Sequence, residues 1–152
     1  KRVAVLFNDI TQRRLSEEAL RESEERFRNI SDNSPMMLWV TDAEGRCLHL
    51  NKRWYQFTGQ TPATGLGFGW LNAVHPEDSP EAERVFREAN AARDVFRVEY
   101  RLRRYDGVYR WAIDAASPRF SDSGEYLGYV GSVIDIQDRK EAEEALRKSR
   151  ER

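Results

Sequence analysis

The sequence is poor in cysteine, in long apolar runs and in net charge. One cysteine among 152 residues excludes an internal disulfide. No run approaches the roughly 18 apolar residues that a transmembrane helix needs. A net charge of −1 provides no attraction to nucleic acid or to an anionic membrane. We therefore expect a cytoplasmic location, no nucleic-acid partner and no direct membrane contact, whether or not the parent protein is membrane-anchored.

Catalytic and metal-binding motifs are also lacking. Nothing in the sequence has the pattern of a phospho-acceptor, nucleotide-binding or cyclase motif, so we expect this chain not to be an enzyme. Cys47 and His49 are expected on one face of a strand, but a metal ion would need further ligands, and His75 is the only other histidine. We predict no metal site.

Charged residues are abundant at the two ends of the chain and repeat there. They make up 34% of the sequence, against about 25% in an average globular domain. Asp9-Ile10 matches Asp135-Ile136, and EEALR at residues 17–21 recurs at residues 143–147. Self-similarity at one long separation is typical of an array of modules. It predicts the tail of a preceding module at 1–10, a linker helix at 11–31, the core at 32–136, and the start of the next linker helix at 137–152.

The predicted linker helix carries a narrow stripe of small and apolar residues. Its members recur at alternating spacings of four and three residues, as in the seam of a coiled coil: Ser16, Leu20, Ser23, Phe27 and Ile30. We predict a parallel homodimer through this seam; the alternative is a solvated helix docked on its own domain. The apolar run at 3–7 (VAVLF) has the pattern of a buried strand of the preceding module. Here we expect it to pack across the dimer or to extend the helix.

The first half of the core combines a hairpin with short helices. Residues 36–50 form two short strands around a turn, and a helix at 52–57 ends at Gly59 in a capping role. After a turn-rich segment, Ser79-Pro80 begins a longer helix, because proline is tolerated in the first turn.

Three strands complete the core. They are predicted at 96–103, 108–116 and 126–136, with Asp106-Gly107 as a hairpin turn and Pro118 limiting the second strand. Five strands with the helices grouped between them predict an α+β fold, an antiparallel sheet with short helices on one face.

Several segments of the core together resemble a PAS domain. They are PMMLWVTDAEGRCLHLN (35–51), WYQFTG (54–59), VHPED (74–78), EYRLRRYDGVYRW (99–111) and GYVGSVIDIQDRK (128–140, the part called the PAC motif). The resemblance implies a five-stranded antiparallel sheet around short helices, flanked by signalling helices. It also implies a sensory or dimerising role in a multi-PAS bacterial signalling protein, most often a sensor histidine kinase and sometimes a diguanylate cyclase.

The cofactor is not identified by the resemblance, but two are disfavoured. A photoactive flavin-binding relative would carry a reactive cysteine near residues 61–71, and a haem-binding relative would carry a histidine in the helix at 80–92. This sequence has neither.

Side chains that could line a small-molecule cavity are mostly aromatic. A pocket for a small ligand needs mainly apolar walls with a few polar groups. The candidates are Leu38, Val40, Trp54, Phe57, Phe68, Trp70, Val98, Tyr100 and Trp111. The alternative is a filled core, since a domain of this size needs such side chains for stability.

The last strand passes directly into the second linker helix at Asp135, Ile136 and Gln137. The resemblance implies that this junction transmits a change in the core to an output domain of the same chain; the family usually has threonine at position 137. Three roles stay open: a ligand-binding relay, a ligand-free dimerising spacer and a protein-docking module.

Overall fold

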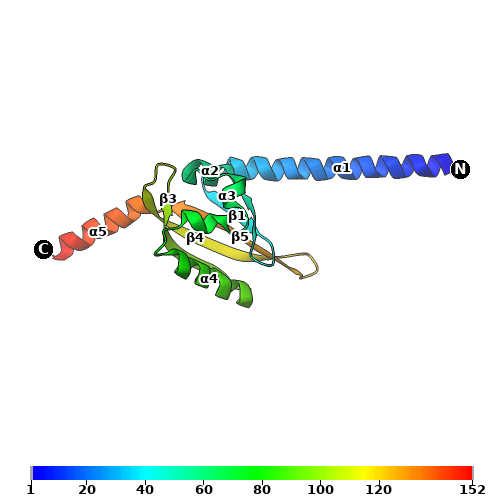
Figure 1. The fold of residues 1–152 in the computed structure, drawn as a ribbon. Coiled ribbons are helices and arrows are strands. Elements are labelled where there is room, and N and C mark those ends of the chain that lie inside the picture. The colour runs from blue at the N-terminus through cyan, green and yellow to red at the C-terminus, as the bar shows by residue number, and fades with distance from the viewer. Residues whose placement is uncertain (1, 152) are drawn as a thin grey trace. The chain divides into compact units, whose positions relative to one another are not determined.

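The computed structural model describes the backbone of residues 2–151 and the side chains of residues 9–151. The chain divides into two compact units, Lys1–Asn33 and Ser34–Arg152. The first is a single helix, α1 (Arg2–Asp32), coloured blue to cyan in Figure 1. The run at 3–7 lies within α1, so of the two expectations for this chain the extension of the helix is confirmed. Periodicity alone does not separate a short apolar strand from a helix. The side chains of this run lie outside the described residues.

The second unit is built on a five-stranded antiparallel sheet. Its strands are β1 (Met37–Thr41), β2 (Cys47–Leu50), β3 (Phe96–Arg103), β4 (Tyr109–Phe120) and β5 (Tyr126–Asp135). Their order across the sheet is β2-β1-β5-β4-β3, so the first hairpin joins the last three strands through the β1–β5 pairing. The predicted α+β fold is confirmed.

Four short helices connect β2 to β3. They are α2 (Lys52–Thr58), α3 (Pro62–Gly65), the 3₁₀ helix η1 (Gly69–Ala73) and α4 (Ser79–Ala92). Gly59 ends α2 in the left-handed conformation, as predicted for a capping glycine. The helices pack their buried side chains against one face of the sheet, where the hydrophobic core lies.

Strand β1 points every second side chain into this core. Met37, Trp39 and Thr41 are buried, whereas Leu38 and Val40 are only partly buried and face the opposite side.

Strand β4 runs further than the sequence predicts and includes Pro118, which pairs with Tyr129 of β5. Pairing between β3 and β4 ends at Phe96 and Ala116. Pro118 therefore lies where β4 has no neighbour on the β3 side, a position that tolerates the missing N–H.

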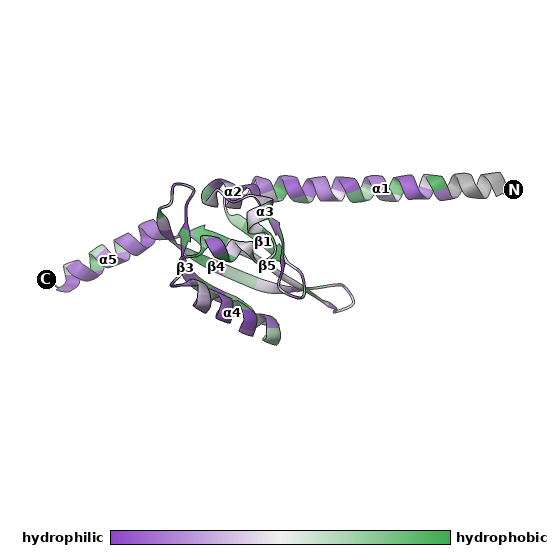
Figure 2. Ribbon diagram, viewed as in Figure 1, coloured by the Kyte–Doolittle hydropathy of each residue, from purple (hydrophilic) through white to green (hydrophobic). Residues whose placement is uncertain are grey.

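The chain leaves the sheet through α5 (Gln137–Glu151), which has no buried residue. Figure 2 shows α5 and the described part of α1 as mostly hydrophilic, with isolated hydrophobic bands. Among the described helices, none combines the length and hydropathy that crossing a membrane requires.

Candidate functional site

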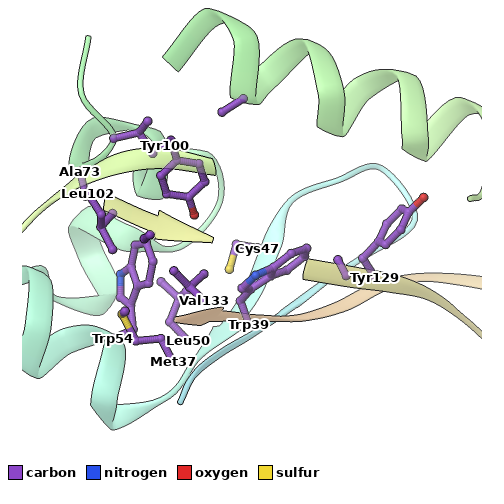
Figure 3. Packing of buried hydrophobic residues seen from close by; sticks show 14 of the residues in the cluster. Met37, Trp39, Cys47, Leu50, Trp54, Ala73, Tyr100, Leu102, Tyr129 and Val133 are labelled. Carbon is purple, nitrogen blue, oxygen red and sulfur yellow. The ribbon is translucent and has the colours of Figure 1, made fainter. Parts of the chain in front are cut away.

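A small cavity lies between the sheet and the helices. Its volume is about 20 Å³, enough for one water-sized group. Six aromatic rings line it: Trp39, Trp54, Trp70, Phe86, Phe96 and Tyr100. Figure 3 shows Tyr100 pointing from β3 toward the middle of this cluster, where Trp39 and Cys47 lie.

The cavity contains one charged side chain, Asp114, on β4. This carboxyl group is 4% exposed, and it accepts hydrogen bonds from Trp39 Nε1 (2.8 Å) and from the Tyr100 hydroxyl (2.9 Å). Burial raises the pKa of Asp114 to about 7, because desolvation penalises the ionised form more than the two hydrogen bonds favour it. The same burial, together with the charge of Asp114, raises the pKa of Tyr100 well above its usual value.

Cys47 also lines the cavity, but His49 does not. A bulge in β2 pairs Cys47 with the inward-facing Thr41 and pairs His49 with Val40 on the other side. An extra residue in one strand reverses the alternation of faces, so the prediction that both side chains share one face is wrong. Burial raises the pKa of the Cys47 thiol to about 11, and a thiol in such surroundings is unreactive.

Four of the nine candidate pocket residues line this cavity: Trp54, Trp70, Val98 and Tyr100. The other five do not. Leu38 and Val40 are on the outer face of β1, and Trp111 is on the outer face of β4, beneath Arg101 and Lys140. Phe57 packs against the edge of the core, and Phe68 is 55% exposed.

Sequence reasoning missed Asp114. It occupies the buried position of Ala112-Ile113-Asp114, where alternation puts the small and the charged residue inside and isoleucine outside. The available signal was an acidic residue two positions after Ala112, the residue that pairs with Tyr100, because residues two apart in a strand share a face.

The junction between β5 and α5 is bonded to β4 at three successive residues. Asp135 accepts from Arg110 Nε (2.5 Å) and from the backbone N–H of Gln137 (2.9 Å). The N–H of Ile136 donates to the carbonyl of Trp111 (2.8 Å), and the Gln137 side-chain oxygen accepts from the N–H of Trp111 (2.9 Å). Both backbone groups of Trp111 thus bond to the junction. Asp135 accepts from the first N–H of α5 and also ties this end of the helix to the sheet.

The first turn of α5 is also bonded to the outer face of β3 and β4. Lys140 forms an ion pair with Glu99 (2.7 Å), and its ammonium lies 4.9 Å from the ring centre of Trp111. Arg101 lies 5.5 Å from the same ring and binds Asp78, whose pKa its guanidinium lowers. These contacts connect α5 through one tryptophan to the beginning of α4.

Residues 48–133 match the model of the PAS fold family. The chain belongs to the PAS family. Uncharacterized protein y4lL of Sinorhizobium fredii is 48% identical over 90% of this chain and 16% of its own length. Peroxide stress-activated histidine kinase mak1 of Schizosaccharomyces pombe is 28% identical over 93% of the chain and 10% of its own length. The chain thus spans a small part of these relatives.

A solved PAS structure has the same fold. It is the N-terminal domain of a diguanylate cyclase with PAS/PAC sensor from Marinobacter aquaeolei, with a TM-score of 0.62 and 20% identity, covering 69% of this chain and 98% of that one. PAS domains are sensory rather than catalytic modules of signalling proteins such as histidine kinases and diguanylate cyclases. They commonly dimerise and share a chain with other domains.

The predicted dimer stripe of this PAS chain lies on α1. Leu20, Phe27 and Ile30 are 61%, 51% and 64% exposed. Ser16 and Ser23 are exposed on the same stripe. Large apolar side chains exposed at regular spacing are typical of a helix that packs against another helix.

Proposed function

We propose that this PAS domain relays a change in its core through α5 to an output domain of the parent protein, such as a histidine kinase or a diguanylate cyclase. The observation that supports the relay is the bonding of Asp135, Ile136 and Gln137 to β4. Strand β4 also carries Asp114, three residues beyond Trp111. A displacement of β4 at the cavity therefore reaches the start of α5 along one strand.

A double-mutant cycle tests this relay without knowledge of the natural signal. In a chimeric histidine kinase, this chain would take the place of one of the kinase's own PAS domains. The substitution Asp114→Asn would then alter the core in place of the unknown natural signal. We expect Asp114→Asn to change the rate of autophosphorylation severalfold, and Asp135→Ala to abolish that response while lowering the unfolding free energy by only about 1 kcal/mol. Coupling between distant positions then appears in the output and not in stability.

Asp138→Ala is the matched control for this cycle. It removes the same charge from a side chain that is 94% exposed. Its ion pair with Arg110, at 3.5 Å, is longer than the 2.5 Å ion pair of Asp135. The response to Asp114→Asn should persist in that background. An equal response with and without Asp135, or no response to Asp114→Asn at all, would refute the relay.

The dimer prediction is tested by substitutions in α1 of the 152-residue chain. Leu20→Asp places a charge in the predicted seam, and an unpaired charge buried there costs several kcal/mol. We expect light scattering to show a homodimer for the unaltered chain and dissociation for Leu20→Asp. Leu15→Asp is the control, because Leu15 is 57% exposed on the same helix but outside the stripe. If the Leu20→Asp chain remains dimeric, the dimer contact is not formed by the predicted stripe on α1.

The size of the cavity favours a second function, a ligand-free dimerising spacer. A cavity of about 20 Å³ accepts no ligand of ordinary metabolite size without rearrangement of its walls. Native mass spectrometry of the chain purified without added ligand separates the two functions, since only a sensor retains a stoichiometric small molecule or gains one on titration.

A further inference from the structure

We propose that the aromatic cavity around Asp114 binds a small organic cation, a protonated alkylamine of a few carbon atoms, with the Asp114 carboxylate as its counter-ion. The inference rests on the proposed sensory function and names the chemical class that this cavity would sense.

The charge of the cavity lining is the first argument. Among the described residues that line the cavity, Asp114 alone has a charged side chain, and none is an arginine, lysine or histidine. In the part of the chain that the structure describes, the titratable side chains facing Asp114 are Cys47 of β2 and Tyr100 of β3. The helices α2, η1 and α4 contribute Trp54, Trp70, Ala82 and Phe86, none of which titrates. A buried carboxylate without a cationic partner is electrostatically incomplete, and a cationic ligand completes it.

The hydrogen bonds of Asp114 leave room for such a ligand. Oδ1 accepts from Trp39 and Oδ2 from Tyr100, one bond on each oxygen. An ionised carboxylate has about four acceptor positions, so each oxygen keeps one for an N–H donor. The two wall donors also fix the orientation of the carboxyl plane, which prearranges it for an ammonium group.

The aromatic walls suit the same class. A cation within about 6 Å of the face of a tryptophan, tyrosine or phenylalanine ring is attracted by the ring electrons, and most strongly where water is excluded. Three tryptophans, two phenylalanines and one tyrosine line the cavity. An anion would be repelled by both Asp114 and the ring faces, and a neutral molecule would gain neither interaction fully.

The volume limits the size of the ligand. About 20 Å³ admits a group of water or ammonium size, and an attached chain of a few carbons has to displace side chains. Trp70 and Phe86 are the suitable ones, because both are only partly buried and stand in edge-to-face contact 6.4 Å apart between the cavity and the surface. Their displacement by the alkyl chain would move η1 relative to α4.

Three two-carbon probes test the inference: ethylammonium chloride, ethanol and sodium acetate, with sodium chloride at equal concentration as the salt control. The readout is the indole N–H resonance of Trp39 in ¹H–¹⁵N spectra of the 152-residue chain, because that N–H donates to Asp114. Trp111, on the outer face, is the internal control. A ligand of three heavy atoms reaches a Kd of about 1 mM at best, so the titration extends to tens of millimolar.

We expect ethylammonium alone to shift the Trp39 resonance saturably and to leave Trp111 unchanged. Its affinity should rise about tenfold from pH 6 to pH 8, as Asp114 ionises through its pKa of about 7. Asp114→Asn should weaken binding at least tenfold, whereas the exposed Asp122→Asn, with the same charge change, should not.

The comparison of probes decides the question even if Asp114→Asn fails to fold. The proposal that the cavity binds a cation is refuted by any of three results: an equal shift of the Trp39 resonance by ethanol, a shift by acetate, or no saturable shift by ethylammonium. The relay itself is judged separately by the Asp135→Ala cycle, which uses no ligand. If the Asp135→Ala cycle supports the relay but ethylammonium does not bind, the domain responds to a different signal.

Discussion

Asp114→Asn is expected to remove a large pH dependence from the stability of this PAS domain. The pKa of Asp114 is about 7 in the folded chain and near its usual 3.8 in the unfolded chain. Between these two values the folded chain binds more protons, so the unfolding free energy falls as the pH rises. The loss is at most about 1.4 kcal/mol per pH unit and about 4 kcal/mol in all, and it is complete once the pH passes 7.

Urea unfolding of both chains from pH 4.5 to pH 8.5 measures this effect. In the asparagine variant an NH₂ group replaces one acceptor oxygen, so the Tyr100 hydroxyl has to accept where it donated, and this change in stability applies at every pH. The informative quantity is therefore how the difference in stability between the two chains changes with pH. We expect that difference to move in favour of the variant by 2 kcal/mol or more, as an order of magnitude, between the ends of the range. Asp122→Asn should follow the unaltered chain throughout. Parallel curves for Asp114→Asn would mean that the carboxyl group is not desolvated.

Gly128→Ala is expected to lower the unfolding free energy of the core by about 3 kcal/mol or more, the sum of a steric overlap and a strained φ. Gly128 has a φ of +119°, and an added β-carbon would lie 2.3 Å from the carbonyl oxygen of Thr41 and 2.5 Å from that of Asp42. Both obstacles are backbone atoms between β1 and β2, so neither can rotate away. The Thr41 carbonyl also accepts a hydrogen bond from Arg119 (2.8 Å), which any shift of the strand would strain.

Gly124→Ala separates the two causes. Gly124 has a similarly positive φ of +88°, but an added β-carbon would meet nothing within 4 Å. It should lose only the cost of the backbone conformation, about 1 kcal/mol. The remainder of the Gly128→Ala effect is the close approach of β5 to the β1–β2 turn. Equal melting temperatures for the two variants would show that the β1–β2 turn moves away from the added β-carbon without loss of stability.

Sequence patterns predicted the strands, their order along the chain and the junction, because each strand has flanking turn signals such as Asp106-Gly107. They did not predict which face of β1 is buried. Met37 and Trp39 alternate with Leu38 and Val40, and all four are apolar, so period two alone cannot choose a face. Trp39 faces inward, where its indole N–H finds Asp114, a partner 75 residues away that local pattern does not reveal.

The same limitation explains the outward position of Trp111 and the missed Asp114. In β4 the inward residues Ala112 and Asp114 are smaller or more polar than the outward Trp111 and Ile113, so hydrophobicity suggests the reversed faces. Packing decides otherwise, since the aromatic rings of the helices and of β1 and β3 already fill the inner side. Trp111 is instead covered outside by Arg101 and Lys140, long side chains whose contacts cross between elements.

Within the described residues, helix α5 is bonded to the sheet at its N-terminal end. Its bonds to the sheet end at Lys140, and the rest of its 15 residues are exposed. At 1.5 Å per residue the helix is about 22 Å long, so a tilt of about 10° at Ile136 would carry its far end sideways by about 4 Å. The first turn of α5 is bonded to the sheet, and the longer remainder of the helix moves with that turn. A movement at Ile136 too small to break any strand pairing would thus become a displacement of several ångströms at the far end of α5.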